Sequence, residues 1–420
     1  MMKSIIAFLC VFMYYASPYR LLGHAMPEVI GMIAILLQLT QAPKLCILKG
    51  YGSFMLYMLF IPPLVSLVTG LPGNYLTSFF PVTLIFYSIA FCVLLPNLDM
   101  GYVLKYYKIL VYAAVALFFV QEVGFHLFGT RPTLYLPLEM YYDDSTLSEF
   151  TEIRASMNRS SSFFLEPAHF AQYILPYYCV VVYNTLRDRK ITLEFLIFSV
   201  VLLILQSGCG FVGLLAIFVS VLFIKGLVPV KLKIVMISAL AMGAFIIAYF
   251  FISNPVVVEL LSRLDEVTSL EVEAYGAQSG FLRIWRGYFI YGILEPIYKV
   301  FGVGIGSLEY VAKLLYIPGS RYEGSFMNGI QTLLVTGGII GTFLFARFFF
   351  KMYKRTSYES RLILICMISI FFIEHMLFTP KMFLFVMMAI AATKNSLNLF
   401  NNPVGTLIRQ NRKSNNEIKS

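Results

Sequence analysis

Apolar runs long enough to cross a lipid bilayer recur along almost the whole of this 420-residue sequence. The hydrocarbon core of a bilayer takes about 20 apolar residues per spanning helix. With only 13% charged residues, the chain also has too few charges to cover a water-soluble domain. The sequence therefore predicts an all-α polytopic integral membrane protein with about 12 transmembrane helices. The runs lie at roughly residues 2–17, 24–42, 52–70, 78–96, 106–128, 163–184, 192–206, 208–224, 232–252, 326–350, 361–378 and 381–399.

The basic residues indicate which ends of these helices face the cytoplasm. If the N-terminus is inside, 21 of the 32 basic residues fall in inner segments, whereas the short outer loops contain only Arg20 and Lys381. Cytoplasmic loops are enriched in Lys and Arg, so both termini are predicted to be cytoplasmic. The net charge of +10 then reflects topology and attraction to anionic membrane lipid, and no nucleic-acid partner is expected. Pro18 follows the first span directly, which favours a retained signal anchor over a cleaved signal.

The remaining organisation is simple. We expect one transmembrane domain over residues 1–400, a cytoplasmic tail at 401–420, and two long outer loops at 129–162 and 253–325. The second loop, between spans nine and ten, is long enough that we expect it to fold onto the membrane surface. The six cysteines lie in or beside spans and form no CxxC pattern. Neither a disulfide framework nor a metal site is predicted, and no cofactor is implied.

The two long outer loops use arginine where the inner segments use lysine. They contain 7 Arg and 2 Lys, against 7 Arg and 14 Lys in the inner segments. Because a guanidinium binds phosphate through paired hydrogen bonds, this bias predicts phosphate recognition near the outer surface. Salt bridges to the thirteen acidic residues of the same loops are the alternative.

Arg283 and Arg286 are the best candidates among these arginines. They flank Trp285 in GFLRIWRGYFIYGILEP (280–296), where apolar residues at helical spacing predict an interfacial helix. Arginines three residues apart on a helix share one side. A plain interfacial anchor is the alternative function of this segment.

The stretch NRSSSFFLEPAHFAQYILPYY (158–178) changes from polar to apolar within a few residues. Its three serines, at 160–162, supply N-cap chemistry and Pro167 suits a first helical turn, so the sixth span is predicted to begin here. Glu166 and His169 then share a face, where they can take a proton from a hydroxyl or hold a polar substrate. A capping Glu and a hydrogen-bonded core His are the alternative. Ionisable groups are costly at membrane depth, which favours the functional interpretation.

Other ionisable groups are predicted at the same level of the membrane. Glu122 and His126 are four residues apart near the outer end of the fifth span. The adjacent Glu374 and His375 lie near the outer end of the eleventh span, and Glu28 opens the second. Together these residues predict a polar cavity at the outer end of the helices.

Three segments resemble sequences of the bacterial oligosaccharide repeat-unit polymerases, the Wzy class within the O-antigen polymerase and ligase superfamily. Their order also matches the family layout of many spans, one long outer loop late in the chain, and a following span that opens with an Asn and contains Gly-Gly. The similarity covers roughly residues 155–345, and the EPxHF pattern is its most specific part. The segments are RSSSFFLEPAHFAQY (159–173), SGFLRIWRGYFIYGI (279–293) followed by FGVGIGSLEY (301–310), and YEGSFMNGIQTLLVTGGIIG (322–341).

The resemblance implies a metal-independent glycosyltransferase at the outer face of the bacterial inner membrane. In that family a glycan on undecaprenyl diphosphate is the donor, a hydroxyl of the next lipid-linked repeat unit is the acceptor, and a chain-length regulator protein is the usual partner. Arg283 matches the loop arginine expected to hold the diphosphate. The candidate catalytic residues are therefore Glu166, His169 and Arg283, and the candidate substrate- and diphosphate-binding residues are Arg154, Arg159, Arg286, Glu323 and Asn328.

The sequence departs from the ligase branch of the superfamily at one position. Ligase-like members have a His eleven residues before the glycine that is Gly338 here, and this chain has Met327. An O-antigen ligase is therefore an alternative without its expected His, and the acceptor base is sought at Glu166 or Glu323. A lipid-linked oligosaccharide flippase is less favoured, because the large loop lies outside and the ionisable groups gather at one surface instead of the midplane. Whether the product is O-antigen, capsule or exopolysaccharide stays open.

Overall fold

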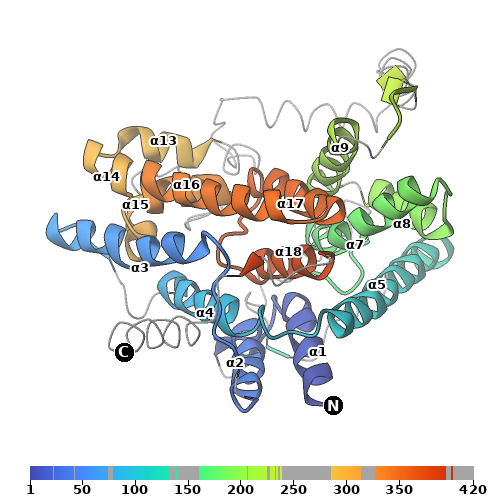
Figure 1. The fold of residues 1–420 in the computed structure, drawn as a ribbon, viewed down its shortest axis with the longest axis horizontal. Coiled ribbons are helices and arrows are strands. Elements are labelled where there is room, and N and C mark those ends of the chain that lie inside the picture. Colours follow the sequence, from blue (N-terminus) through green and yellow to red (C-terminus); the bar gives the residue numbers. More distant parts are fainter. Residues whose placement is uncertain are drawn as a thin grey trace, which may run out of the picture.

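The structure is a computed structural model in which the described residues are mainly helical (Figure 1). An all-helical architecture is therefore confirmed for the part of the chain that the structure describes. Two short strands, β1 (Arg20–Leu21) and β2 (His24–Ala25), pair antiparallel between the first two helices. The structure describes residues 1–21, 23–41, 43–73, 79–129, 131, 138–139, 160–205, 207–224, 228–231, 233–234, 237–238, 285–313, 327–393 and 399–400.

Eleven of the twelve predicted apolar runs contain a described helix, whereas most of the run 232–252 lies outside the described residues. Among the residues described between α9 and α16, three short helices and the 3-10 turn η1 (Ile305–Ser307) occupy part of the second outer loop. The helices are α1 (Met2–Tyr15), α2 (Met26–Leu39), α3 (Tyr51–Val68), α4 (Phe79–Val93), α5 (Met100–Phe128), α7 (Pro167–Asp188), α8 (Leu193–Ile204), α9 (Gly208–Phe223), α13 (Arg286–Ile293), α14 (Pro296–Phe301), α15 (Leu308–Ala312), α16 (Gly329–Arg355), α17 (Tyr358–Phe371) and α18 (Pro380–Ala391).

Three of the described helices, α3, α5 and α16, are both long enough and apolar enough to cross a membrane. Six others are apolar but only 10–17 residues long, which is shorter than the roughly 20 residues that a bilayer takes. The described helices are thus compatible with an all-helical membrane protein, and the number of about twelve crossings stays a prediction.

Polar side chains at the helix starts explain where several helices begin. Each accepts a hydrogen bond from a backbone N–H of the first turn, a group that has no partner inside the helix. The capping residues are Asp99 before α5, Thr192 before α8, Ser207 before α9, Asn328 before α16, Ser357 before α17 and Thr379 before α18.

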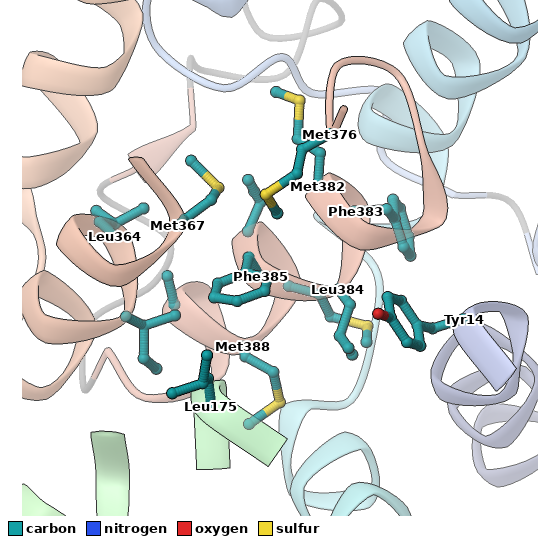
Figure 2. Packing of buried hydrophobic residues seen from close by; sticks show 14 of the residues in the cluster. Tyr14, Leu175, Leu364, Met367, Met376, Met382, Phe383, Leu384, Phe385 and Met388 are labelled. Atoms are coloured by element: carbon teal, nitrogen blue, oxygen red, sulfur yellow. The ribbon is translucent and has the colours of Figure 1, made fainter. Parts of the chain in front are cut away.

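Helix α18 is the centre of the bundle. Every residue from Met382 to Ile390 is buried, and the helix packs against α1, α5, α7 and α17. Figure 2 shows Leu384 on the side of α18 toward Tyr14 of α1, and Met388 next to Leu175 of α7. A helix that is apolar all round belongs inside a bundle, so α18 is enclosed by protein although its sequence reads like a membrane span.

Helix ends that are predicted to face the same side of the membrane lie together. At the end predicted to be cytoplasmic, the Lys108 Nζ of α5 lies 3.1 Å from the Glu194 Oε1 of α8. The Arg187 Nη1 at the end of α7 lies 3.9 Å from the Glu359 Oε1 at the start of α17. Both pairs are between ends assigned to one side from charge alone, so the relative sidedness of these four helices agrees with the predicted topology.

The described part of the second outer loop, residues 285–313, packs against the helices of the bundle. Figure 1 shows α13, α14 and α15 gathered beside one half of α16. Residues 302–308 are all buried, and α14 and η1 pack against both α3 and α16. The contacts of residues 302–304 fall at Val335 and Thr336, about seven residues into α16. At 1.5 Å per residue this is about 10 Å from the start of that helix.

A break in α16 accommodates this inserted loop. Gly338 has non-helical angles (φ 63°, ψ −166°) within the helix, so carbonyls in the preceding turn lose their usual donors four residues on. The backbone N–H of Val303 donates to the Val335 carbonyl at 3.0 Å, and that of Gly304 to the Thr336 carbonyl at 2.9 Å. Irregular backbone inside a membrane protein requires such internal partners. The GVG segment 302–304 is therefore a structural element that fills the break.

Candidate functional site

Helix α7 begins at Pro167, and the three serines that were predicted to cap it do not do so. Glu166 occupies the N-cap position with extended backbone (φ −129°, ψ 148°), and its side chain makes no capping bond. The serines at 160–162 are instead buried in the turn that precedes the helix. The Ser162 backbone is left-handed (φ 57°), whereas a serine N-cap typically has extended backbone. The N-cap is therefore Glu166, four residues after the last of the three serines.

Helix α5 holds this turn in place. The backbone N–H of Ser162 donates to the Gln121 Oε1 at 2.8 Å, and the Gln121 Nε2 donates back to the Ser162 carbonyl at 3.0 Å. The Ser162 hydroxyl donates to the Ala114 carbonyl at 2.6 Å. All of these groups are buried, and each therefore needs its partner. The serine turn at 160–162 thus positions the start of α7 through contacts with α5.

Arg131 adds a second attachment for the same turn. Its Nε donates to the Ser160 hydroxyl at 3.0 Å, and its guanidinium lies 3.6 Å from the centroid of the Phe125 ring. Its Nη2 is 3.8 Å from the Glu122 Oε1, and burial lowers the pKa of Arg131 from its usual value. His126 Nε2 is 4.0 Å from the Glu122 Oε2, as the four-residue spacing predicted. This outer arginine therefore makes the salt bridge that was the alternative to phosphate binding.

A chain of buried polar side chains leads inward from the first turn of α7. The Tyr14 hydroxyl of α1 donates to the His169 carbonyl at 2.9 Å and to the Gln172 Oε1 at 3.2 Å. The Gln172 Nε2 lies 3.2 Å from the Cys209 Sγ of α9, and that thiol is 4.0 Å from the Glu374 Oε2. Four separate segments of the sequence thus meet at this end of the bundle.

The connection between α17 and α18 completes this polar cluster. The Lys381 Nζ lies 3.4 Å from the Glu374 Oε1, and the side chains of these two residues are only 12% and 6% exposed. The His375 Nδ1 is 3.3 Å from the Thr332 hydroxyl of α16. Buried charges in proteins are normally paired, and Glu374 and Lys381 supply each other's counter-charge. A polar cluster at this end of the bundle was predicted from the acidic and histidine residues.

Asn328 begins α16 beside this cluster. Its Oδ1 accepts from the Gln331 backbone N–H at 2.9 Å, and its Nδ2 donates to the Phe372 carbonyl at 2.6 Å. The Gly329 backbone N–H donates to the Glu374 carbonyl at 2.9 Å. The side chain that was a candidate for substrate binding therefore joins the start of α16 to the end of α17.

Arg286 begins α13 and is buried, with 3% of its surface exposed. Its Nη2 donates to the Ala312 carbonyl at the end of α15 at 3.0 Å. Burial lowers the pKa of Arg286 from its usual value. The neighbouring Gly287 lies against Gln331 of α16, where any side chain would clash. Arg286 therefore ties two short helices together, while Phe289 and Ile293 of α13 are 45% and 60% exposed.

The structure brings part of the predicted site together. Glu166 and His169 lie at one helix start, near Tyr14 and the cluster around Glu374, and Asn328 adjoins that cluster. Arg286 is linked to Asn328 through Gln331 and Gly287. The other four candidates lie outside the described residues: Arg154, Arg159, Arg283 and Glu323.

Sequence reasoning missed four side chains that organise this end of the bundle. Tyr14, Gln172 and Gln121 are uncharged residues within apolar runs, and Lys381 was counted only as a short-loop charge. The sequence did contain a signal for the two glutamines, which is a polar amide within an apolar run. An amide inside a spanning helix needs an internal hydrogen-bond partner. Glu28 was included in the predicted cavity, and its Oε1 accepts from the Tyr87 hydroxyl at 3.4 Å between α2 and α4.

The site offers acid–base groups and hydrogen-bond donors. Among the described residues, no group of three or more His, Cys, Asp or Glu side chains is arranged to hold a metal ion. No protein-family model matches the chain, and no curated protein matches it.

Proposed function

We propose that this protein polymerises lipid-linked oligosaccharide repeat units at the outer face of the bacterial cytoplasmic membrane. The observation that carries the proposal is the position of Glu166 and His169. Both belong to the most specific part of the sequence resemblance, and both lie at the start of α7 beside a buried polar cluster. In an apolar bundle such groups are costly and mark functional sites more often than not.

In the proposed reaction, an acceptor sugar hydroxyl attacks the anomeric carbon of the donor glycan. A new C–O bond forms, the bond from that carbon to the diphosphate oxygen breaks, and undecaprenyl diphosphate leaves with the bonding electrons. The hydroxyl proton passes to a base, for which Glu166 at the rim of α7 is the first candidate and His169 the second. Diphosphate is already a good leaving group, so the main further requirement is stabilisation of its charge.

Arginine is suited to stabilising the charge of the leaving diphosphate. Arg283, three residues before the buried Arg286, is the proposed diphosphate ligand, with Arg159 and Arg154 as further cations and Glu323 as an alternative base. The proposal also includes about twelve crossings, both termini in the cytoplasm, and a chain-length regulator as partner. Support for these parts comes from the charge distribution and the sequence resemblance.

A ligase that transfers finished glycan to another acceptor is the second candidate function. The imidazole expected at position 327 is missing, but the His375 ring lies against the main chain of Met327 and near the Thr332 hydroxyl. His375, which follows α17, thus lies next to the position at which ligase-like members have their histidine. This placement keeps a ligase under consideration.

The length profile of surface glycan, from cells with and without the gene, tests both functions. A polymerase predicts that deletion leaves single repeat units on the carrier and erases the ladder of longer products. Accumulation of long glycan on the carrier lipid would instead identify a ligase. Lipid-linked units trapped on the cytoplasmic side would contradict both functions and identify a transporter.

A further inference from the structure

The buried ion pair between Glu374 and Lys381 is joined to the first turn of α7 by a continuous series of hydrogen bonds. The series passes from Glu374 through Cys209 and Gln172 to Tyr14. All three linking residues are buried, with exposed fractions of 2% or less. Removing one buried partner leaves its neighbour unsatisfied, at a cost well above the value of the bond itself.

The charge at one end fixes the direction of every bond in this series. An ionised carboxylate only accepts hydrogen bonds, so the Cys209 thiol donates to Glu374. The sulfur must then accept from the Gln172 Nε2, which leaves the Gln172 Oε1 to accept from the Tyr14 hydroxyl. Hydrogen bonds aligned in one direction polarise and strengthen one another.

The far end of the series acts on the proposed site. The single hydroxyl proton of Tyr14 is shared between the Gln172 Oε1 and the carbonyl of His169, one turn from Glu166. Its orientation therefore fixes the first turn of α7, which the Gln121–Ser162 bonds hold from the other side.

We propose that the Glu374–Lys381 ion pair, acting through Cys209, Gln172 and Tyr14, positions Glu166 and His169 for the transfer reaction. This inference rests on the proposed function for the identity of the reaction. The five residues are positioning residues, because they act through the main chain and first turn of α7. Misplacement of reacting groups by about 1 Å lowers rates by up to about a hundredfold.

Cys209 offers the sharpest test, because a matched set of variants exists. Cys209→Ala removes the link without changing any charge, whereas Cys209→Ser retains a group that both donates and accepts. Cys10→Ala is the control, since Cys10 is an equally buried thiol in the apolar core of α1. Hydrogen–deuterium exchange of the backbone amides in residues 168–173 is measured on the full-length protein in detergent.

We expect Cys209→Ala to accelerate exchange in this turn at least about tenfold, which corresponds to about 1.4 kcal/mol. Cys209→Ser and Cys10→Ala are expected to exchange as the wild type does. Tyr14→Phe, which removes the last bond and retains the ring, should reproduce the effect and serves if Cys209→Ala does not fold. Unchanged exchange in a folded Cys209→Ala or Tyr14→Phe variant would overturn the proposal, as would equal acceleration in Cys10→Ala.

Activity is measured in parallel, with undecaprenyl-diphosphate-linked repeat units extracted from cells lacking the gene. We expect Cys209→Ala to lower kcat by about tenfold to a hundredfold with little change in KM, and Cys209→Ser to restore it. A wild type that makes no polymer contradicts the proposed function, while the exchange data still decide the positioning. A polymerising wild type with normal kcat in Cys209→Ala contradicts the positioning alone.

Discussion

The backbone of Gly302 lies directly against that of Gly338, at the break in α16. A Cβ added to Gly338 would come 2.6 Å from the Gly302 nitrogen, and one added to Gly302 would collide with the Thr336 carbonyl. Both glycines have positive φ angles, of 84° and 63°. The Tyr57 hydroxyl of α3 links the same two segments, because it donates to the carbonyls of Phe301 and Gly337 at 2.9 and 3.1 Å. The outer loop and α16 are thus joined main chain to main chain.

Alanine at either glycine should therefore destabilise the protein. We expect Gly302→Ala and Gly338→Ala each to lower the free energy of unfolding by at least about 2 kcal/mol, from backbone strain and from the clash. The thermal midpoint of the detergent-solubilised protein measures the change. Gly292→Ala in α13 is the control, because nothing lies within 4 Å of the added Cβ there. An equal loss in all three variants would show that the Gly302–Gly338 contact is not the cause.

The two arginines of the LRIWR segment should behave differently when each is replaced. Arg286→Ala removes a buried donor to the Ala312 carbonyl, and we expect a loss of about 1–3 kcal/mol in stability. Arg283→Ala should abolish chain extension while the amount of protein in the membrane stays normal. The glycan length profile and an immunoblot of membranes separate the two effects. A stable Arg283→Ala variant that still makes long glycan would remove Arg283 from the proposed site.

Gln121 should be required for the position of the turn before α7. Its two bonds to Ser162 are buried, and Gln121→Ala leaves both backbone groups without those partners. We expect a loss of about 1–3 kcal/mol in unfolding free energy, measured as a lower thermal midpoint. Gln41→Ala is the control, since Gln41 is exposed at the end of α2. A thermal midpoint equal to that of the control would show that this turn is held by other contacts.

The helical architecture could be predicted from the sequence because apolar runs and basic loops follow directly from the physics of a bilayer. The runs agree with the described helices, and even the shared sidedness of Lys108 and Glu194 follows from charge. The start of α7 could not be placed correctly, because serine caps a helix only when its backbone is extended. Ser162 is instead held in a left-handed turn by Gln121, a residue 41 positions earlier.

The candidate site shows the same limit. The three-residue spacing predicted that Glu166 lies near His169. The positions of the ionisable residues predicted that Glu374 joins other polar groups at one end of the bundle. The partners that organise this cluster, Tyr14 and Cys209, lie far away in the sequence and look like ordinary core residues. Arg286 shows the opposite case, because its sequence context predicted a phosphate ligand on an interfacial helix, whereas the structure buries it against α15.

The proposed sidedness can be tested at two exposed positions. His126 near the end of α5 and Asp188 at the end of α7 have side chains 75% and 54% exposed. In intact cells, a membrane-impermeant maleimide should label the His126→Cys protein and should reach the Asp188→Cys protein only after permeabilisation. The native thiols interfere little, because five of the six cysteines are buried and Cys92 is partly so. Labelling of Asp188→Cys alone in intact cells would invert the topology.

Glu166 provides the most direct test of the chemistry. Its backbone sets the start of α7, but its side chain makes no capping bond, so Glu166→Gln should leave the fold and membrane level unchanged. Glutamine keeps the shape of the side chain and cannot take a proton. If Glu166 is the base, chain extension from lipid-linked repeat units should fall by about a hundredfold or more. Glu309→Gln is the control, since Glu309 is an exposed carboxylate in α15. Near-normal product length in Glu166→Gln would move the base role to His169 or Glu323, and the same replacement strategy then separates those two.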